Sequence, residues 1–586
     1  MKLTWVSFLA QLNLNQDLPF LLVAVFVGLV TGYVAVIFHE AIRIISAALF
    51  EGTTALGLPS LNNYPRMALL PLIPALGGLI VGLYNAFVVK ARPEHGLASV
   101  IKSVAQKEGR IARKNWFHKT FTSVVSIGTG GGAGREAPIA QVGASIGSAV
   151  AQMLKFSPGR TRTLLGCGAA AGLSAVFNAP IGGVMFAVEV ILGDFSVKTF
   201  SPIVVAAVVG TVLSRSYLGN NPTFMVHEYS LVSNSELVLY FILGVLAGLS
   251  AALFIKTFYV IEELLKKFEK RFRIPAWAMP AFGGLLCGLI SMWLPELYGF
   301  SYDAINKAIR GTESWENMIA VYLLKPVVAA FTVGSGGSGG MFAPSMKMGA
   351  MLGGMFGKLV NNLFPGMTAA SGAYALVGMG ALTAGIMRAP LTVILILFEV
   401  TGQYEIVLPI MFAAVTSALV ARLVYPYTME TYVLEKEGVR VGFGIALTIA
   451  GNISVDKVMR QYCFRFNKNS KAESIIDAFH NSHESNFFIT ADDGYFIGII
   501  GLEELRTPLR TGEYKDLIAD DIVKKNVTFL YDTSKLDEAL KIFELTDYTY
   551  LPIVSSETGY LLGVIKQEDT FAYYRKQMSI ITTDEA

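Results

Sequence analysis

The chain has 586 residues, of which 53% are hydrophobic and only 16% are charged, whereas a soluble globular chain has about 25% charged residues. This balance excludes an ordinary soluble protein and is typical of a membrane protein. The net charge of +3 adds little, and we expect no nucleic-acid partner. The cysteines lie far apart without metal-type spacing, so we assign no chemistry to Cys167, Cys287 and Cys463.

Apolar runs near the length that a bilayer core requires, about 20 residues, predict membrane-spanning helices. No short basic-then-apolar leader precedes the first run, so we expect it to be retained and the N-terminus to start in the cytoplasm. Basic clusters predict cytoplasmic loops at 107–119, 155–162 and 266–273. The predicted spans include residues 20–38, 67–88, 238–260 and 276–294.

A repeat divides the apolar region into two related halves, at about residues 67–220 and 275–434. Residues of a glycine-rich segment recur in register 206 positions later, and a second block with Ala-Pro and Glu-Val pairs also recurs. The first set is Gly128, Gly130, Gly131, Gly134, Pro138, Gly143 and Gly147, answered by Gly334, Gly336, Gly337, Gly340, Pro344, Gly349 and Gly353. The second is Ala179-Pro180 and Glu189-Val190, answered by Ala389-Pro390 and Glu399-Val400.

The segments at 128–147 and 334–353 are candidates for broken helices that meet at a shared site near the midplane, as in transporters with internal repeats. A helix that begins in such a segment presents unpaired N–H groups and the positive end of its dipole, which attract anions. Close helix packing through small residues is the alternative interpretation. The pair Arg135-Glu136 adds an ionisable carboxylate in apolar surroundings, which indicates a functional residue. Glu136 is predicted to be a gate and a proton carrier, or else one partner of a structural ion pair.

After about residue 434 the apolar runs shorten and alternating stretches appear, which predicts a soluble α/β part. Two segments 64 positions apart, Ser470–Glu473 and Ser534–Asp537, have the pattern of a capping box and predict helix starts. Strand-like stretches follow at 486–490 and 550–554. We divide the chain into a membrane domain at 1–435, a linker at 436–451, two copies of one unit at 452–515 and 516–578, and a tail at 579–586.

These residues resemble the CLC family of chloride channels and chloride/proton antiporters, through Gly134-Arg-Glu-Ala-Pro138, Gly340-Met-Phe-Ala-Pro344 and Phe398-Glu-Val-Thr401. The resemblance implies an all-α polytopic membrane domain of two inverted halves with tilted and broken helices. It also implies a homodimer with one pore in each subunit, contacts with membrane lipids, and a multi-pass location in the cell membrane. The C-terminal part is similar to paired cytoplasmic CBS domains, which often bind adenine nucleotides such as ATP.

The resemblance places the anion site on backbone amides and makes Glu136 the gating glutamate. The amides belong to Arg135, Glu136, Ala137, Met341, Phe342 and Ala343.

Some positions depart from the family pattern. His95 stands where the family has a serine that touches the anion, so the ring is a candidate ligand or faces the cytoplasmic mouth. Glu430 aligns with the central tyrosine of the inner gate, and Tyr427 and Tyr432 are candidates after a small shift in register. Val190 occupies the position of the inner proton-relay glutamate, as in the family's channels.

Other charged residues leave alternatives open. Lys347 stands where the family is apolar, and it is expected to snorkel, to pair with a carboxylate or to raise the local anion concentration. Glu189 and Glu399 are interpreted first as groups that pack helices or satisfy backbone. In the soluble part Asp569 is the nucleotide candidate, while Lys566 replaces a usual threonine or serine, so a dimerising or assembly role is an equal alternative.

The sequence therefore predicts voltage- or pH-sensitive transport of chloride and similar small anions, as a channel or a chloride/proton antiporter. The C-terminal part is expected to regulate gating or assembly, with no metal and no required cofactor. The alternative is a polytopic membrane enzyme with a structural CBS dimerisation tail, although the six histidines show no metalloprotease-like spacing.

Overall fold

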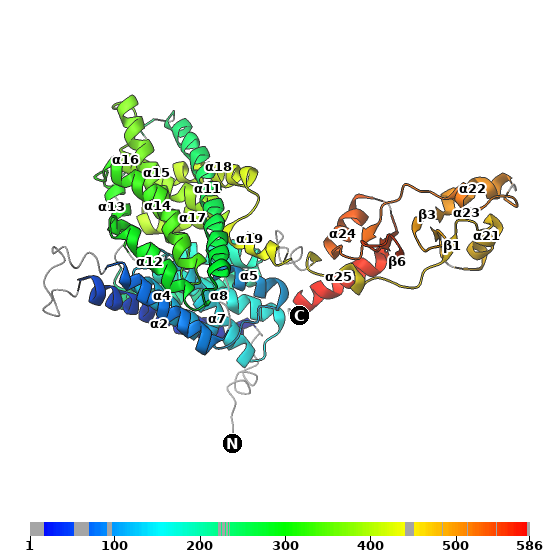
Figure 1. Cartoon of the computed structure of the whole chain (residues 1–586), viewed down its shortest axis with the longest axis horizontal. Coiled ribbons are helices and arrows are strands. Elements are labelled where there is room, and N and C mark those ends of the chain that lie inside the picture. Colours follow the sequence, from blue (N-terminus) through cyan, green and yellow to red (C-terminus); the bar gives the residue numbers. More distant parts are fainter. Residues whose placement is uncertain are drawn as a thin grey trace, which may run out of the picture. The chain divides into compact units, whose positions relative to one another are not determined.

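The structure is a computed structural model that describes residues 17–51, 70–90, 96–220, 224, 229, 232–233, 235–299, 301–439, 450–482, 484–511, 514–546 and 548–582. The chain forms two compact units, Met1–Gly438 and Val439–Ala586 (Figure 1). His95, residues 440–449 of the predicted linker and the last four residues lie outside the described part.

The first unit is helical, and its helices occur twice in the same order. The first series is α2 (Asp17–Ser46), α4 (Leu72–Tyr84), α5 (Gly96–Gln106), α6 (Asn115–Gly128), α7 (Glu136–Met153), α8 (Pro158–Phe177), α9 (Pro180–Phe186) and α10 (Val197–Leu218). The second is α11 (Glu236–Phe272), α12 (Met279–Ser291), α13 (Asp303–Ile309), α14 (Trp315–Gly334), α15 (Phe342–Leu363), α16 (Ser371–Met387), α17 (Pro390–Thr401) and α18 (Val407–Val424), followed by α19 (Met429–Lys436).

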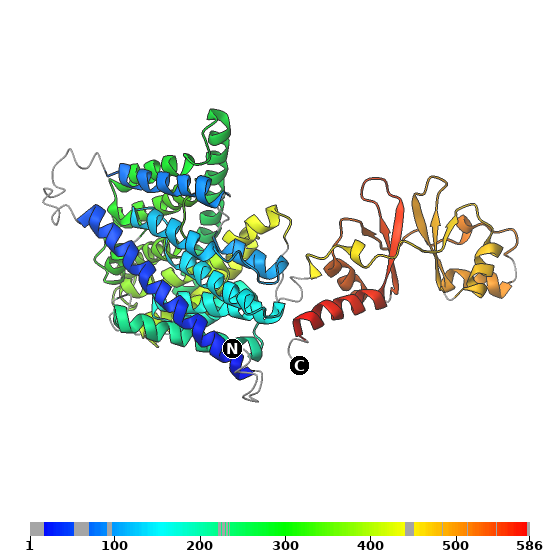
Figure 2. The same cartoon turned by 90° about the horizontal axis from the view of Figure 1, so that it is seen from below.

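The two series also pack in the same way. Helix α7 packs on α8 as α15 packs on α16, α8 contacts α10 as α16 contacts α18, and α2 packs on α10 as α11 packs on α18. Figure 2 shows this unit as a thick bundle of helices that run in several directions. The repeat of glycines in the sequence therefore corresponds to two structurally related halves. The first half also includes α2, and the second half also includes α11.

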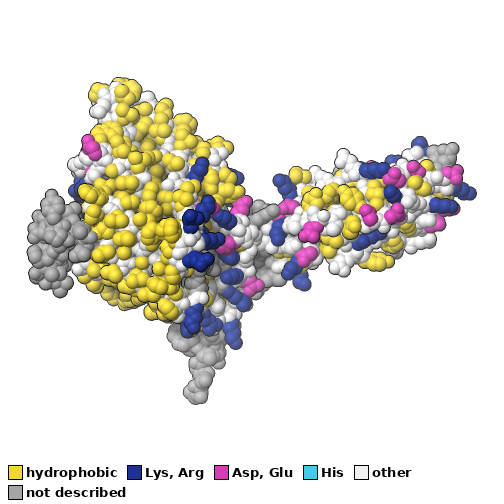
Figure 3. All heavy atoms as spheres, viewed as in Figure 1, with side chains coloured by type: hydrophobic (Ala, Val, Ile, Leu, Met, Phe, Trp, Pro, Cys, Tyr) yellow, Lys and Arg dark blue, Asp and Glu magenta, His cyan; other side chains and the backbone are white. Residues whose placement is uncertain are grey.

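Several helices are long and apolar enough to cross a bilayer, and their outer faces are hydrophobic. In the described part these segments are Leu18–Phe50, Leu72–Val89, Val197–Leu218, Glu236–Phe272, Trp315–Gly334 and Val407–Lys436. Figure 3 shows a broad hydrophobic surface on this unit, with Lys and Arg gathered along one edge. Exposed leucine, phenylalanine and isoleucine side chains on soluble surfaces would be costly, but they suit contact with lipid.

The predicted span at 276–294 is shorter in the structure than the sequence suggested. Helix α12 has 13 residues, begins next to Pro280 and ends before the turn at Pro295–Leu297. Its length of about 20 Å, at 1.5 Å per residue, is too small for a full crossing. The apolar run continues beyond the helix, and apolarity alone could not show where the helix ends.

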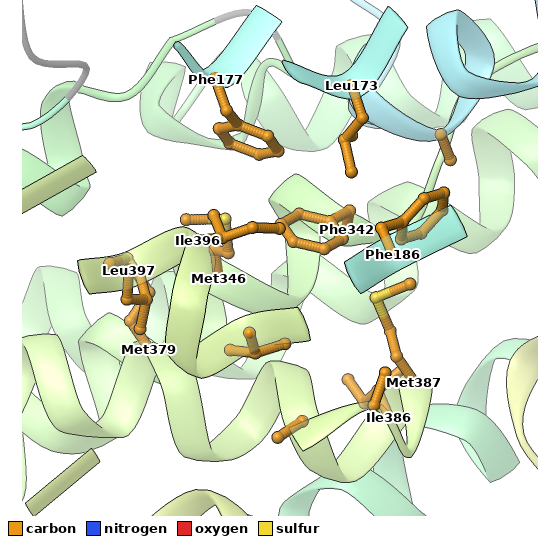
Figure 4. Packing of buried hydrophobic residues seen from close by; sticks show 14 of the residues in the cluster. Leu173, Phe177, Phe186, Phe342, Met346, Met379, Ile386, Met387, Ile396 and Leu397 are labelled. Atoms are coloured by element: carbon orange, nitrogen blue, oxygen red, sulfur yellow. The ribbon is translucent and has the colours of Figure 1, made fainter. Parts of the chain in front are cut away.

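The core of this unit lies around α8 and α16, which are buried along almost their whole length. Phe342, at the start of α15, packs against Phe177 at the end of α8, with ring centroids 5.2 Å apart. Figure 4 shows the Phe342 ring between Phe177 and Phe186, with Met346 nearby. The first turn of α15 is therefore anchored in the apolar core.

The second unit contains two copies of one α/β fold. In each, a parallel strand pair is joined to an antiparallel pair, in the orders β1-β2-β3 and β4-β5-β6. The first copy has β1 (Arg465–Asn467), α21 (Ala472–Asn481), β2 (Asn486–Thr490), β3 (Phe496–Gly501) and α22 (Leu502–Thr511). The second has β4 (Leu530–Tyr531), α24 (Leu536–Leu545), β5 (Tyr550–Val554), β6 (Leu561–Lys566) and α25 (Gln567–Thr582).

The predicted capping boxes are wrong, although the amphipathic helices and the strands are confirmed. Helices α21 and α24 start after Lys471 and Lys535, and neither lysine caps its helix with a side-chain hydrogen bond. Ser470 instead accepts from the amide of Asn467 at 3.1 Å and closes the turn before the helix. The Ser470 side chain therefore binds within the turn that precedes α21 and does not cap the helix.

Candidate functional site: the meeting of two helix N-termini

Two glycine-rich loops end α6 and α14 and cross each other before α7 and α15 begin. Gly130 and Gly336 have φ values of +92° and +104°, in the region that favours glycine. Gly134 and Gly340 then exchange two backbone hydrogen bonds of 2.8 Å each, as a short antiparallel bridge. The helices that follow thus begin at the same place, from opposite halves of the chain.

Reciprocal side-chain bonds repeat this local two-fold symmetry. The amide of Gly132 donates to Thr332 Oγ1 at 2.9 Å, and the equivalent amide of Ser338 donates to Ser126 Oγ at 3.3 Å. The loops are also tightly packed, because a Cβ added at Gly340 would lie 2.5 Å from the Ala137 side chain. The glycines are needed for this close approach.

The first turns of α7 and α15 present unpaired backbone N–H groups at the crossing. Arg135 and Met341 are the residues that precede the two helices, and Pro138 and Pro344 stand at the third position of each. The first N–H groups of a helix have no partner within that helix and carry the positive end of its dipole. This arrangement is suited to binding an anion.

Glu136 is the acidic residue at this place and is only 1% exposed. Its Oε1 accepts a hydrogen bond from the Tyr302 hydroxyl, whereas the Arg135 Nε lies 4.0 Å from the same oxygen. Among the described residues, Oε2 has no hydrogen-bond partner. The guanidinium of Arg135 instead contacts His39 Nδ1 at 3.0 Å and lies over the Tyr302 ring. The chief partner of Glu136 is thus Tyr302, which sequence reasoning missed.

A cavity of about 50 Å³ lies next to the crossing. Its walls include Ala137 of α7 and Met341 before α15, so it reaches the beginnings of both helices. The remaining wall residues are Gly96, Leu97, Ala98, Phe258, Tyr259, Val333, Gly339, Gly340, Met429 and Glu430. A space of this size holds a small ion or a few water molecules.

Of the three inner-gate candidates, only Glu430 lines this cavity. Tyr432 packs on Tyr259 with ring centroids 3.9 Å apart, and Tyr427 contacts Tyr432 edge to face, with ring centroids 5.9 Å apart. Tyr259, on α11, does line the cavity, and its hydroxyl donates to the carbonyl of Met429. The sequence analysis considered tyrosines only near residue 430 and therefore missed Tyr259 of α11.

Glu189 and Glu399 each accept hydrogen bonds from the first amides of a helix in the opposite half. Their interpretation as groups that satisfy the backbone is therefore confirmed. Glu189 accepts from the amide of Thr392 at 2.7 Å and from its hydroxyl at 2.6 Å. Glu399 accepts from the amides of Ile181 and Gly182 at 3.0 and 2.7 Å. Val190, beside Glu189, packs against the main apolar core.

Lys347 does not snorkel, because it is only 2% exposed. Its Nζ donates to the carbonyl oxygens of Glu296 and Tyr298 at 2.5 and 3.2 Å. A second buried lysine, Lys325 of α14, donates to the carbonyl of Leu297 at 2.6 Å. Sequence reasoning missed Lys325, and both lysines converge on one turn.

The second unit has a cleft of about 380 Å³ between its two copies. Asp569, the nucleotide candidate, is bound by the guanidinium of Arg460 through bonds of 2.6 and 2.9 Å. Inside the cleft Glu484 accepts from Lys566 and from the Tyr550 hydroxyl, each at 2.8 Å. Partial burial alone would raise the pKa of Glu484, but these two bonds outweigh it and hold that pKa below its ordinary value.

In the first copy Glu504 accepts from the amide of Gly501 at 2.9 Å, at the start of α22. In the described part of the chain no cluster of three metal-ligating side chains occurs.

Comparison with known proteins matches this architecture. The profile of the voltage-gated chloride channel family matches residues 76–422, and that of the CBS domain matches residues 518–576. This chain belongs to the voltage-gated chloride channel (CLC) family. It is a multi-pass membrane protein with a C-terminal CBS region, and it is a member of a family of transporters and channels, not an enzyme. CLC-family anion transport is its function at this level.

Named relatives within the CLC family include both channels and exchangers. A putative ClcB-like chloride channel protein of Ralstonia nicotianae is 33% identical over 60% of this chain and 82% of the relative. The H⁺/Cl⁻ exchange transporter ClcA of Salmonella paratyphi B is 29% identical over 70% of this chain and 86% of the relative.

Solved structures show the same fold. A slow cyanobacterial Cl⁻/H⁺ antiporter has a TM-score of 0.64 at 23% identity and covers 72% of this chain and 99% of its own. A eukaryotic CLC transporter has a TM-score of 0.61 at 20% identity and covers 94% of this chain and 98% of its own. The second comparison extends the shared fold to the CBS region.

Proposed function

We propose that this chain moves chloride and similar small anions along a pathway gated by Glu136. The observation that supports this best is the meeting of α7 and α15 at the bridge between Gly134 and Gly340, with a buried carboxylate beside it. The anion is bound by the backbone amides of the two first turns. These are the amides of Arg135, Glu136, Ala137, Met341, Phe342 and Ala343.

Glu136 acts as a gate because its carboxylate is itself an anion at an anion site. It excludes the transported ion while it occupies the site and admits that ion when protonation or competition displaces it. The amide dipoles attract the anion with partial charges only, so that it is also released quickly. This mechanism makes transport sensitive to pH or voltage.

The inner end of the pathway is the cavity lined by Glu430 and Tyr259. We place the inner gate at Glu430, because a carboxylate facing an anion cavity repels the ion unless it is neutralised or moves aside. Tyr259 is bound to the carbonyl of Met429, next to Glu430, and helps to hold the start of α19 in place. Tyr427 and Tyr432 support Tyr259 from behind and do not face the ion.

Both channel-like conduction and chloride/proton exchange fit this pathway. Val190 has no ionisable group that could transfer a proton. The carboxylate of the adjacent Glu189 accepts hydrogen bonds from the start of α17. These two facts favour a channel. Glu136 and Glu430 are two carboxylates along the pathway, and they favour exchange. A simultaneous measurement of both ions decides between them.

We expect purified protein in chloride-loaded liposomes to release chloride down its gradient at a fixed potential. Glu136→Ala removes the gate, and chloride release is expected to persist. Uphill proton movement that is lost in Glu136→Ala identifies an exchanger, and chloride release with no proton movement identifies a channel. Glu405→Ala, an exposed control, should behave as wild type. The proposal is wrong if the wild-type protein moves neither ion.

The CBS pair is proposed to regulate gating or assembly, with the cleft as the place for an adenine nucleotide. Asp569 is already bound by Arg460, so a nucleotide that uses Asp569 must first displace that arginine. ATP, ADP and AMP should each be tested by thermal shift of the full chain, with Asp569→Asn as the matched control. Stabilisation of the wild type alone supports nucleotide binding, and no stabilisation leaves assembly as the role.

Assembly and location follow from the family. We propose a homodimer with one pathway in each subunit, placed in the cell membrane with the CBS pair in the cytoplasm. Light scattering of the detergent-solubilised protein measures the mass of the assembly, and a monomeric mass would contradict the dimer. Protease accessibility of the CBS pair in intact and in broken cells measures its side of the membrane.

A further inference from the structure

Two lysines of the second half are buried close to the site of Glu136. Lys325 on α14 is 1% exposed and Lys347 on α15 is 2% exposed. Lysine is almost never fully buried unless it is paired with a counterion, because an ammonium group loses its hydration on burial. The pathway described so far assigns neither lysine a role.

These lysines donate to backbone carbonyl oxygens, which do not neutralise their charges. Both ammonium groups donate to the carbonyl oxygens of one turn, at Glu296, Leu297 and Tyr298. Within the described part of the chain, neither lysine forms an ion pair with a carboxylate. A carbonyl is a dipole without net charge, so the positive potential of two ammonium groups extends beyond the turn.

This turn is joined to the anion site at two points. The amide of Gly299 donates to the carbonyl of Gly131 at 3.1 Å, within the first glycine loop. Tyr302 follows a few residues later and donates to Glu136. The lysines therefore lie behind the same short segment that contacts both the glycine loop and the gate.

Glu136 is the buried carboxylate that Tyr302 binds. Of the acidic residues in the segment of the turn, Glu296 contacts Lys307 at 3.5 Å and Asp303 contacts Ser301. On the other side, Arg135 is the positive group beside Glu136. Glu136 is thus the buried carboxylate that is joined, through Tyr302, to the segment that the lysines bind.

We propose that Lys325 and Lys347 supply the fixed positive charge of the anion pathway, balanced by the Glu136 carboxylate when the gate is closed and by the transported anion when it is open. This inference rests on the proposed function. The lysines are positioning residues, because they act through their field and do not contact the ion. The amides contact the ion weakly, so it is attracted without being held by a full charge.

The test is chloride binding to the full-length protein, by isothermal titration in a chloride-free buffer. In the Glu136→Gln background no carboxylate competes with the ion, so Lys347→Met and Lys325→Met, which remove one positive charge each, should raise the Kd for chloride at least about tenfold above that of Glu136→Gln alone. Lys358→Met is the matched control. Lys358 lies on α15 roughly three helical turns further along and also donates to a backbone carbonyl, that of Glu313. In the same background its substitution should leave the Kd within about twofold of that of Glu136→Gln.

Comparison of the two backgrounds separates charge from structure. With Glu136 present, each lysine attracts both the ion and the carboxylate that competes with it, so Lys347→Met should change the Kd by a smaller factor than it does in the Glu136→Gln background. A packing defect caused by Lys347→Met would change the Kd by the same factor in both backgrounds.

Two results overturn the inference. One is a Kd that Lys347→Met and Lys325→Met leave unchanged in the Glu136→Gln background. The other is a Kd that Lys347→Met raises by the same factor with and without Glu136. If Lys347→Met does not elute as a single species on gel filtration, Lys325→Met and its double variant with Glu136→Gln decide. If the wild-type protein binds no chloride and moves none, the proposed function fails as well, and the two failures are thereby distinguished.

Discussion

The carboxylate of Glu136 is held through one oxygen only. Tyr302 donates to Oε1, the guanidinium of Arg135 is 4.0 Å from that atom, and Oε2 has no partner in the described part of the chain. A buried polar atom without a hydrogen bond costs about 1–3 kcal/mol. The hydrogen-bonding capacity of Glu136 is therefore only partly satisfied, and if Glu136 is the proposed gate, loss of its single strong bond should open it.

The variant Tyr302→Phe tests this expectation. It removes the donor and keeps the ring over which the Arg135 guanidinium lies. A hydrogen bond to a charged group contributes about 1.5–3 kcal/mol, so the equilibrium between closed and open gate should shift at least about tenfold. We expect faster chloride release from liposomes than with wild type.

The matched control for that measurement is Tyr322→Phe. Tyr322 bonds to Ser250 at 2.6 Å, away from the two first turns. Its loss should leave the rate of chloride release near that of wild type. An unchanged or slower rate in Tyr302→Phe would mean that the tyrosine does not hold the gate closed.

Site residues that repeat, or that are charged within an apolar segment, could be identified from the sequence. The residues that they contact could not. Glu136 was identified because an ionisable side chain in an apolar segment is costly unless it is used. Tyr302, Tyr259 and Lys325 approach the site from segments without a repeat signal near them. Their importance depends on contacts between distant parts of the chain, which the pattern of one segment does not contain.

At the scale of helices, the two halves stabilise each other by exchanging acidic caps. Glu189 caps the start of α17, and Glu399 caps the start of α9. A carboxylate at a helix N-terminus satisfies amides that would otherwise be unpaired and interacts favourably with the dipole. The caps also join α9 of the first half to α17 of the second half, which are in contact.

We expect Glu189→Ala and Glu399→Ala to destabilise the protein by about 1–3 kcal/mol each. Glu189 accepts from the amides of Leu391 and Thr392, and Glu399 also accepts from two amides, which would be left without an acceptor. The measurement is the midpoint of thermal unfolding in detergent, with exposed Glu405→Ala as the control. The double variant should lose less than the sum of the single losses if the two caps support one interface. Midpoints equal to that of the control would show that water replaces the caps.

Some helix boundaries could be predicted from the sequence, and others could not. The breaks before α7 and α15 were predicted, because glycine and proline at fixed positions constrain the backbone directly. The capping boxes at Ser470 and Ser534 were wrong, because serine satisfies a turn as readily as a helix start. The length of α12 was also misjudged, since an apolar run can continue past the end of a helix.

At the scale of the whole molecule, the CBS pair is held together by a polar contact between its two copies. Glu484 belongs to the first copy, and its partners Lys566 and Tyr550 belong to the second. The copies also share an apolar cluster that includes Phe488 and Val564. The ion pair lies in the cleft between the two copies.

This contact should stabilise the pair in a pH-dependent way. Partial burial would raise the pKa of Glu484, but its bonds to Lys566 and Tyr550 hold that pKa below the ordinary value of 4.5. A carboxyl whose pKa is lowered by folding stabilises the folded state above its unfolded pKa, and that contribution is lost as the pH falls through the folded pKa. The contribution of Glu484 should therefore be complete at neutral pH and vanish in acid.

Hydrogen exchange of the full chain, followed by mass spectrometry, measures this. At pH 7, Glu484→Gln should exchange faster than wild type in the peptides that contain β2 and β6, because the charged contact between the copies is lost. At a pH below the folded pKa of Glu484 the two proteins should exchange alike, because the wild-type carboxyl is then neutral as well. Glu503→Gln, on the exposed face of α22, controls for the loss of one charge. A difference that persists unchanged in acid would show that Glu484 acts through its shape and not through its charge.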